Sequence, residues 1–309
     1  MLKRFSIKKI SKYTILLLIV FLFYLFPSKN KYSLENTVGK EIKANYHDIF
    51  LLDKNGYVSK TDVEVSSLKK DKLIEELISI MTIDGKYQDK IPNGFNSLLP
   101  CDTILINKEI KDNVVILNFS KELLELTKEM EEKAIESIIY TMTSIKDIDK
   151  VKILVDNKIL KKLPKSGKIL DEELSRDYGI NKSYNVNSIK NISKVTIYYT
   201  SKTNNNDIYY VPVTKYSNRS DDKIKIIIDE LTSKISYESN LMSYLNYNAK
   251  LLDYSITDDE IDLNFNEYLF DNDSNKKVLE EVIYTISYSI HDNYDVDIIK
   301  IYVNNKEIK

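Results

Sequence analysis

Few residues of this 309-residue chain have the type and spacing to do chemistry. The two histidines, His47 and His291, lie far apart and do not occupy matched positions in the repeat described below. A histidine acid, base or metal ligand needs partners close to the imidazole. The sequence offers no recognisable set of them, so we expect both histidines in surface or loop positions.

A short acidic segment resembles the opening of a calcium-binding loop. Asp271, Asp273 and Asn275 have the alternating spacing of such a loop, but Lys276 replaces the glycine of position six and Val282 replaces the bidentate glutamate. We therefore interpret the segment as a turn before a helix and expect no metal site.

The remaining candidates also lack partners. Asp258, Asp259 and Glu260 fall in a predicted hairpin turn, where carboxylates are normally solvated. Cys101 is the only cysteine, so neither an intrachain disulfide nor a thiolate zinc site can form, and we expect a small buried side chain. No phosphate-binding glycine loop and no Gly-x-Ser-x-Gly elbow occurs. We predict no catalytic, cofactor-binding or metal-binding residue, no cofactor and no enzymatic activity.

Charge is distributed unevenly along the chain. The first 31 residues contain seven Lys or Arg and no acid, which leaves the rest of the chain acidic. An acidic body repels phosphate backbones, so we expect no nucleic-acid partner.

An unbroken apolar run, residues 14–26, follows the basic cluster and is typical of an export segment. We expect residues 1–28 to be an uncleaved signal-anchor that enters the membrane through residues 10–26, with a removed signal peptide as the alternative. Residues 29–45 then form a tether, and the positive-inside rule places the following domains outside the cytoplasm.

The chain contains an internal sequence repeat. Asn118-Phe119 matches Asn264-Phe265 at an offset of 146, Tyr140-Thr141 matches Tyr284-Thr285 at 144, and Val155 matches Val303 at 148. Two copies of this size indicate a tandem domain pair. We expect a first domain at 46–160, a linker at 161–190 and a second domain at 191–309.

Apolar periodicity predicts the same elements in each copy. The first copy has strands at 49–52, 57–65, 103–108, 114–119 and 152–155, and helices at 71–81 and around 134–142. The second has strands at 195–199, 208–213, 250–256, 260–265 and 298–303, and helices at 224–231 and 278–286. The order β-β-α-β-β-α-β predicts a small α+β domain with helices laid on a sheet.

Three further positions carry local expectations. Ser120 is placed to cap the turn after its strand. Pro212 favours an edge strand, because proline cannot donate to a ladder. The apolar linker residues suggest that the linker packs against a domain; they are Leu163, Ile169, Leu170, Leu174 and Ile180.

The amino-acid sequences of these elements resemble those of the GerMN domain. The resemblance rests on residues 208–213 (IYYVPV), on Leu98, Leu99, Pro100 and Thr103, on residues 115–121, and on the terminal strand at 151–158. Two copies behind a membrane segment resemble the GerM family of sporulation and germination proteins, whose folds are similar to ring-building motifs. This chain lacks the N-terminal lipobox cysteine of typical members, so lipid anchoring does not transfer.

The resemblance implies a non-enzymatic protein of the space between mother cell and forespore. Its partners would be proteins of a channel or ring complex, with self-association possible, and it would be a single-pass cell-membrane protein with extracytoplasmic domains. The alternative is an envelope protein that binds cell-wall glycan or peptide in a cleft between the two domains. An envelope hydrolase would require converging carboxylates in such a cleft.

Overall fold

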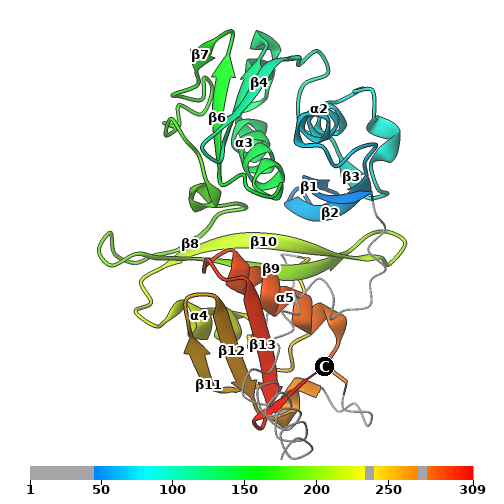
Figure 1. Cartoon of the computed structure of the whole chain (residues 1–309). Coiled ribbons are helices and arrows are strands. Elements are labelled where there is room, and N and C mark those ends of the chain that lie inside the picture. Colours follow the sequence, from blue (N-terminus) through cyan, green and yellow to red (C-terminus); the bar gives the residue numbers. More distant parts are fainter. Residues whose placement is uncertain (1–44, 234–239, 271–276, 309) are drawn as a thin grey trace, which may run out of the picture. The chain divides into compact units, whose positions relative to one another are not determined.

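The computed structural model describes residues 45–233, 240–270 and 277–308, and Figure 1 shows their elements. The first repeat contains β1 (Tyr46–Asp53), β2 (Val58–Glu64), α2 (Lys70–Met81), β3 (Phe95–Asn96), β4 (Leu105–Lys111), β5 (Val114–Phe119), α3 (Lys128–Met142), β6 (Lys150–Val155) and β7 (Lys158–Ile159). Short 3-10 helices lie at Gln88–Lys90 (η2) and Lys121–Glu125 (η3). The predicted β-β-α-β-β-α-β order is confirmed, and β3 and β7 are two-residue additions.

The second repeat has the same plan. It contains β9 (Ser193–Lys202), β10 (Ile208–Ser217), α4 (Lys223–Thr232), β11 (Leu251–Ile256), β12 (Glu260–Phe265), the 3-10 helix η6 (Glu267–Phe270), α5 (Glu280–His291), β13 (Ile298–Val303) and β14 (Lys306–Glu307). Each repeat has its own four-stranded sheet, in the orders β4-β5-β6-β7 and β11-β12-β13-β14. The α+β class and the tandem arrangement are therefore confirmed.

The hairpins follow from turn chemistry. Asp112 and Asn113 connect β4 to β5 with φ values of 50° and 61°, and Asp156 and Asn157 connect β6 to β7 with 47° and 63°. Both central residues of a type I′ turn need positive φ, which asparagine and aspartate tolerate best. The Asp-Asn pairs of the sequence therefore set the register of both hairpins.

A buried asparagine in each repeat holds the last turn of the sheet. The side chain of Asn118 donates to Asn157 Oδ1 at 2.8 Å and accepts from the Asn157 N–H at 2.9 Å. Asn264 makes the same pair with Asn305, also at 2.8 and 2.9 Å. The repeated Asn-Phe pair thus has a structural reason. The asparagine amide holds the turn, and the adjacent Phe119 or Phe265 is fully buried.

The long helices α3 and α5 occupy equivalent places in the two repeats. Their structural register differs by one helical turn from the register of the sequence match. The Phe50 N–H donates to Thr141 Oγ1 at 3.0 Å, and the Tyr198 N–H donates to Ser289 Oγ at 2.9 Å, across the same separation of 91 residues. Thr141 therefore corresponds to Ser289, and the predicted match to Thr285 is wrong by four residues. Identical side chains misled the alignment, whereas the hydroxyl that receives a strand N–H determines the true register.

Two local predictions were wrong. Cys101 is exposed, because it lies in the turn that the Thr103 N–H closes onto the Pro100 carbonyl at 3.0 Å. Ser120 precedes η3 but does not cap it. Its hydroxyl accepts instead from the Ile104 N–H at 3.0 Å.

Candidate functional site: the junction between the repeats

Strands from both repeats form one sheet at the junction. Its order is β3-β1-β2-β10-β8, and β9 pairs with β10 along its whole length. The first repeat meets the second where β2 runs antiparallel to β10, with Tyr210 opposite Lys60. The linker adds β8 (Ser183–Asn185), which pairs in parallel with the end of β10. Both repeats belong to a single compact unit.

Asn181 of the linker completes the ladder where β2 and β10 separate. Its Oδ1 accepts from the Val58 N–H at 2.9 Å, and its Nδ2 donates to the carbonyls of Val58 and Pro212, both at 2.8 Å. One amide therefore satisfies backbone groups of both repeats. Pro212 is in an interior strand, so the predicted edge position is wrong. Its missing N–H faces the part of the ladder that the Asn181 side chain fills.

Arg176 connects three segments of the chain. It lies in the linker 3-10 helix η4 (Arg176–Tyr178), where its Nη1 forms an ion pair with Asp292 at the C-cap of α5. Its Nε donates to Thr143 Oγ1 at 3.0 Å, and its guanidinium lies 4.9 Å from the ring centre of Tyr140. The Asp292 side chain is only 3 % exposed, so this pair joins the end of α5 to the end of α3 in a largely buried position.

A second buried ion pair anchors the linker to α3. Lys182 Nζ lies 2.5 Å from Glu136 Oε1 and 2.7 Å from Glu132 Oε1, and the Lys182 and Glu136 side chains are 7 % and 4 % exposed. Burial raises the pKa of the Glu136 carboxyl above its usual value, although Lys182 opposes this shift. The ammonium group also lies 4.0 Å from the ring centre of Tyr178.

Tyrosine rings pack against one another beside the shared sheet. Tyr284 and Tyr288 of α5 stack with ring centres 5.5 Å apart, and Tyr210 of β10 meets both edge-on at 5.6 and 5.3 Å. Lys60 of β2 lies 4.8 Å from the ring centre of Tyr288 and forms an ion pair with Asp48. Burial raises the pKa of the Asp48 carboxyl, but the charge and hydrogen bond of Lys60, together with the charges of His47 and Arg176, lower it by more, so the pKa lies below its usual value.

The linker is structural along most of its length. Leu163, Leu170, Leu174 and Ile180 are at most 4 % exposed, so the prediction that they pack against a domain is confirmed. Ile169 is the exception at 79 % exposed, because it lies on the outer side of the turn whose Lys162–Ile169 bridge closes the segment.

The structure brings none of the sequence candidates together. His47 is half-buried in β1, where its Nδ1 lies 2.8 Å from the Asp48 carbonyl and burial lowers its pKa. His291 is exposed at the end of α5, a helix end and not a loop. The acidic residues 258–260 lie at the turn between β11 and β12 and the start of β12. The calcium-like segment lies outside the described residues. Among the residues described, no group of three or more His, Cys, Asp or Glu could hold a metal ion.

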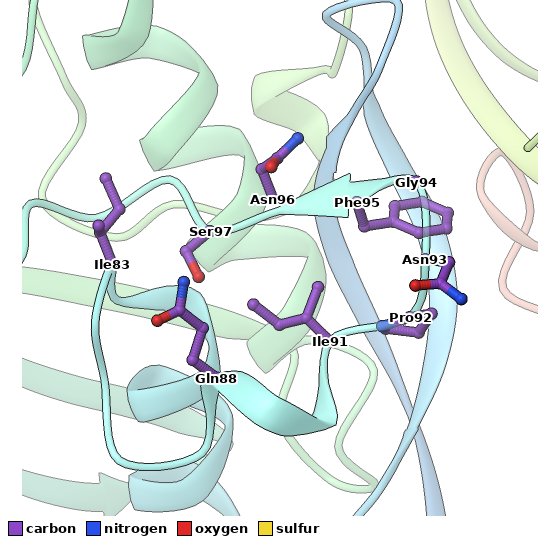
Figure 2. A pocket seen from close by; sticks show the side chains of 9 residues that line it. All are labelled: Ile83, Gln88, Ile91, Pro92, Asn93, Gly94, Phe95, Asn96 and Ser97. Carbon is purple, nitrogen blue, oxygen red and sulfur yellow. The ribbon is translucent and has the colours of Figure 1, made fainter. Parts of the chain in front are cut away.

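A hollow lies in the first repeat beside β3, at the end of the shared sheet. Figure 2 shows it within the loop after α2, lined by Ile83, Gln88 and residues 91–97 of the first repeat. Its volume is about 430 Å³.

The fold defines a class of protein. It is a tandem α+β module whose two repeats share one sheet across a hydrogen-bonded junction. The family model described as "Germane: Sporulation and spore germination" matches residues 48–161 and again 196–309. The chain belongs to this family.

Two relatives give the same result. The chain is 32% identical over 265 residues to the spore germination protein GerM of Bacillus subtilis (strain 168), across 84% of this chain and 71% of that protein. A solved structure of the tandem GerMN domains of the sporulation protein GerM from Bacillus subtilis matches with a TM-score of 0.77 and 31% identity. That match covers 84% of this chain and 91% of the solved one. The predicted resemblance is confirmed, and the chain is related to sporulation and germination proteins.

The predicted signal-anchor at residues 1–28 and tether at 29–45 lie outside the described residues, apart from Asn45. Within the described part, no helix has the length and apolarity needed to span a membrane.

Proposed function

We propose that this protein is a non-enzymatic assembly component of the sporulating cell. It would be held at the membrane by residues 10–26 and act on protein partners in the space between mother cell and forespore. The family membership supports a role in sporulation or germination. The export-like N-terminus, with its basic cluster and apolar run, supports the location.

The observation that carries the assembly role is a pair of equivalent apolar positions at two sheet edges. β4 and β11 are edge strands of their sheets, and each has a register shift at its start. The shifts place Ile106 and Leu252 at corresponding points, and these side chains are 49% and 53% exposed. Apolar side chains exposed at the same place in both repeats are suited to protein contact.

The register shift also indicates the mode of contact. A β-bulge twists an edge strand and discourages the addition of another strand. We therefore infer that a partner packs on the protruding side chains of Ile106 and Leu252. Pairing of a partner strand with the β4 and β11 backbones is the mode that the bulges oppose.

The junction favours assembly over the alternative of a ligand cleft between the repeats. Asn181 and Arg176 fill that boundary with hydrogen bonds and an ion pair, and the linker is packed into it. Such a boundary holds two binding edges in a fixed relation, which suits a component of a larger assembly.

Localisation through a sporulation time course tests the proposal. A fluorescent fusion of the wild-type chain should become enriched at the engulfing septum. A double variant, Ile106→Asp with Leu252→Asp, should lose this enrichment while its melting temperature stays close to that of the wild type. Ile169→Asp is the matched control, because Ile169 is exposed but lies in the linker. Uniform wild-type fluorescence, or equal enrichment of the double variant, would contradict the proposal.

A further inference from the structure

The loop after α2 is a closed, pre-formed structure. Its ends are joined where the Ile83 N–H donates to the Leu99 carbonyl at 2.9 Å and the Leu98 N–H donates to the Met81 carbonyl at 3.0 Å. A surface loop of this length with adjoining ends is an Ω-loop, a type that is often functional. We call residues 83–98 the Ω-loop.

Two further contacts and one glycine fix the conformation of the Ω-loop. Lys90 Nζ lies 2.5 Å from Glu76 Oε1, and the Glu76 side chain is 4 % exposed. Phe95 packs edge-on against Tyr209 of the second repeat, with ring centres 5.0 Å apart. A side chain at Gly85 would place its Cβ 2.0 Å from the Ser79 carbonyl oxygen, so only glycine fits. These features favour one conformation of the loop that surrounds the hollow.

The lining of the hollow combines amides with aliphatic side chains and has no charge. Gln88, Asn93 and Asn96 contribute side-chain amides, and Ile83, Ile91 and Pro92 contribute apolar surface. In Figure 2 the Gln88 side chain points toward Ser97 across the hollow. Within the described part of the chain, the side chains of Gln88 and Asn93 make no hydrogen bond to the protein, so each amide offers donors and an acceptor to a ligand.

We propose that this hollow binds an uncharged sugar of an oligosaccharide. Amides that both donate and accept match hydroxyl groups, and aliphatic side chains match the apolar face of a sugar ring. The absence of charged lining residues disfavours phosphates, carboxylates and cations, which need a compensating charge. A volume of about 430 Å³ is within the usual range for small-molecule sites.

An extended peptide fits the hollow less well than a sugar. Peptides are commonly gripped through a free strand edge, and the strand beside the hollow, β3, has only two residues. Exposed Ile83, at 42%, can instead cover one face of a ring. The site lies apart from the edge residues Ile106 and Leu252 and does not depend on the assembly role.

Saturation-transfer difference NMR with the full-length chain tests the site. The probes are tri-N-acetylchitotriose, maltotriose and tri-alanine. We expect saturable transfer to at least one trisaccharide, and the two sugars distinguish an N-acetylated from a plain ligand. Transfer to tri-alanine alone, or to none of the three, overturns the proposal.

Variants then locate the binding. Gln88→Ala combined with Asn93→Ala removes two of the three lining amides and should weaken sugar affinity by about tenfold, since each hydrogen bond contributes modestly. The control is Asn107→Ala, an exposed asparagine on β4. Both variants should melt like the wild type, because none of these side chains has a hydrogen bond within the described residues. Unchanged affinity in the double variant overturns the proposal, as does an equal loss in the control.

Discussion

Removing the guanidinium of Arg176 should weaken the contact between the two repeats and lower the stability of the chain. Arg176→Met keeps part of the packing against Tyr140 but leaves the Asp292 carboxylate, 3 % exposed, without its cation. Removing one partner of a fully buried pair costs about 3 to 5 kcal/mol. The Arg176 side chain is 29% exposed, so solvent reduces the expected loss to about 2 to 3 kcal/mol.

The assay is thermal unfolding followed by circular dichroism. A loss of this size should lower the melting temperature by about 4 to 10 °C. A second substitution, Asp292→Asn, removes the stranded charge and should recover part of the loss, so the two changes should not be additive. A melting temperature within about 1 °C of the wild type for Arg176→Met, or strict additivity in the double variant, would refute the buried-pair reasoning.

Three other changes test separate parts of the structure. Asn181→Ala should cost about 2 to 4 kcal/mol and speed hydrogen exchange at the Val58 amide, because backbone groups of both repeats lose their partner. Glu131 accepts from two linker N–H groups, which lower the pKa of its carboxyl although burial raises it. Stability should therefore fall as the pH drops below about 4.3, where the unfolded chain takes up the proton first, and urea titrations of Glu131→Gln should show a weaker pH dependence. Gly85→Ala should destabilise the Ω-loop by about 1 to 3 kcal/mol, measured by urea unfolding, because its Cβ would overlap the Ser79 carbonyl.

Two of these changes have a matched control. Asn181→Gly removes the same amide but suits the positive φ of 45° at this position, so it isolates the hydrogen bonds from backbone strain. Stability of the wild type that rises on acidification would contradict the role of Glu131. Lys86→Ala alters an exposed neighbour of Gly85 and should leave unfolding unchanged. Equal stability of Asn181→Gly and the wild type would show that the bridging amide contributes nothing.

Local pattern accounts for most of the fold that could be predicted. Period-2 runs such as residues 114–119 and helical stripes such as residues 71–81 became strand and helix, because each buries one face against its own repeat. The Asp-Asn turns are a local signal of the same kind, since only a few residue types tolerate positive φ. These signals depend on neighbours within one element, and a sequence records such neighbours directly.

The junction could not be predicted from the sequence, because its contacts join residues that are far apart in the chain. Asn181 meets Val58 across 123 positions, and Arg176 meets Asp292 across 116. Nothing in the local wording distinguishes these residues from other polar linker residues. Pro212 misled the prediction in the same way, because the Asn181 amide that donates to its carbonyl comes from a distant segment. One signal was available: a polar linker that contains several apolar residues, which predicted packing against a domain but not the segments between which the linker packs.

We propose that this chain works through protein contacts at equivalent edges of its two repeats. Photocrosslinking in sporulating cells tests it most directly, with a photoreactive residue placed at Ile106, at Leu252 or at the exposed linker position Ile169. The account predicts protein adducts from the first two positions, formed during engulfment, and none from the third. Absence of adducts from both edge positions, or the same adducts from Ile169, would contradict it.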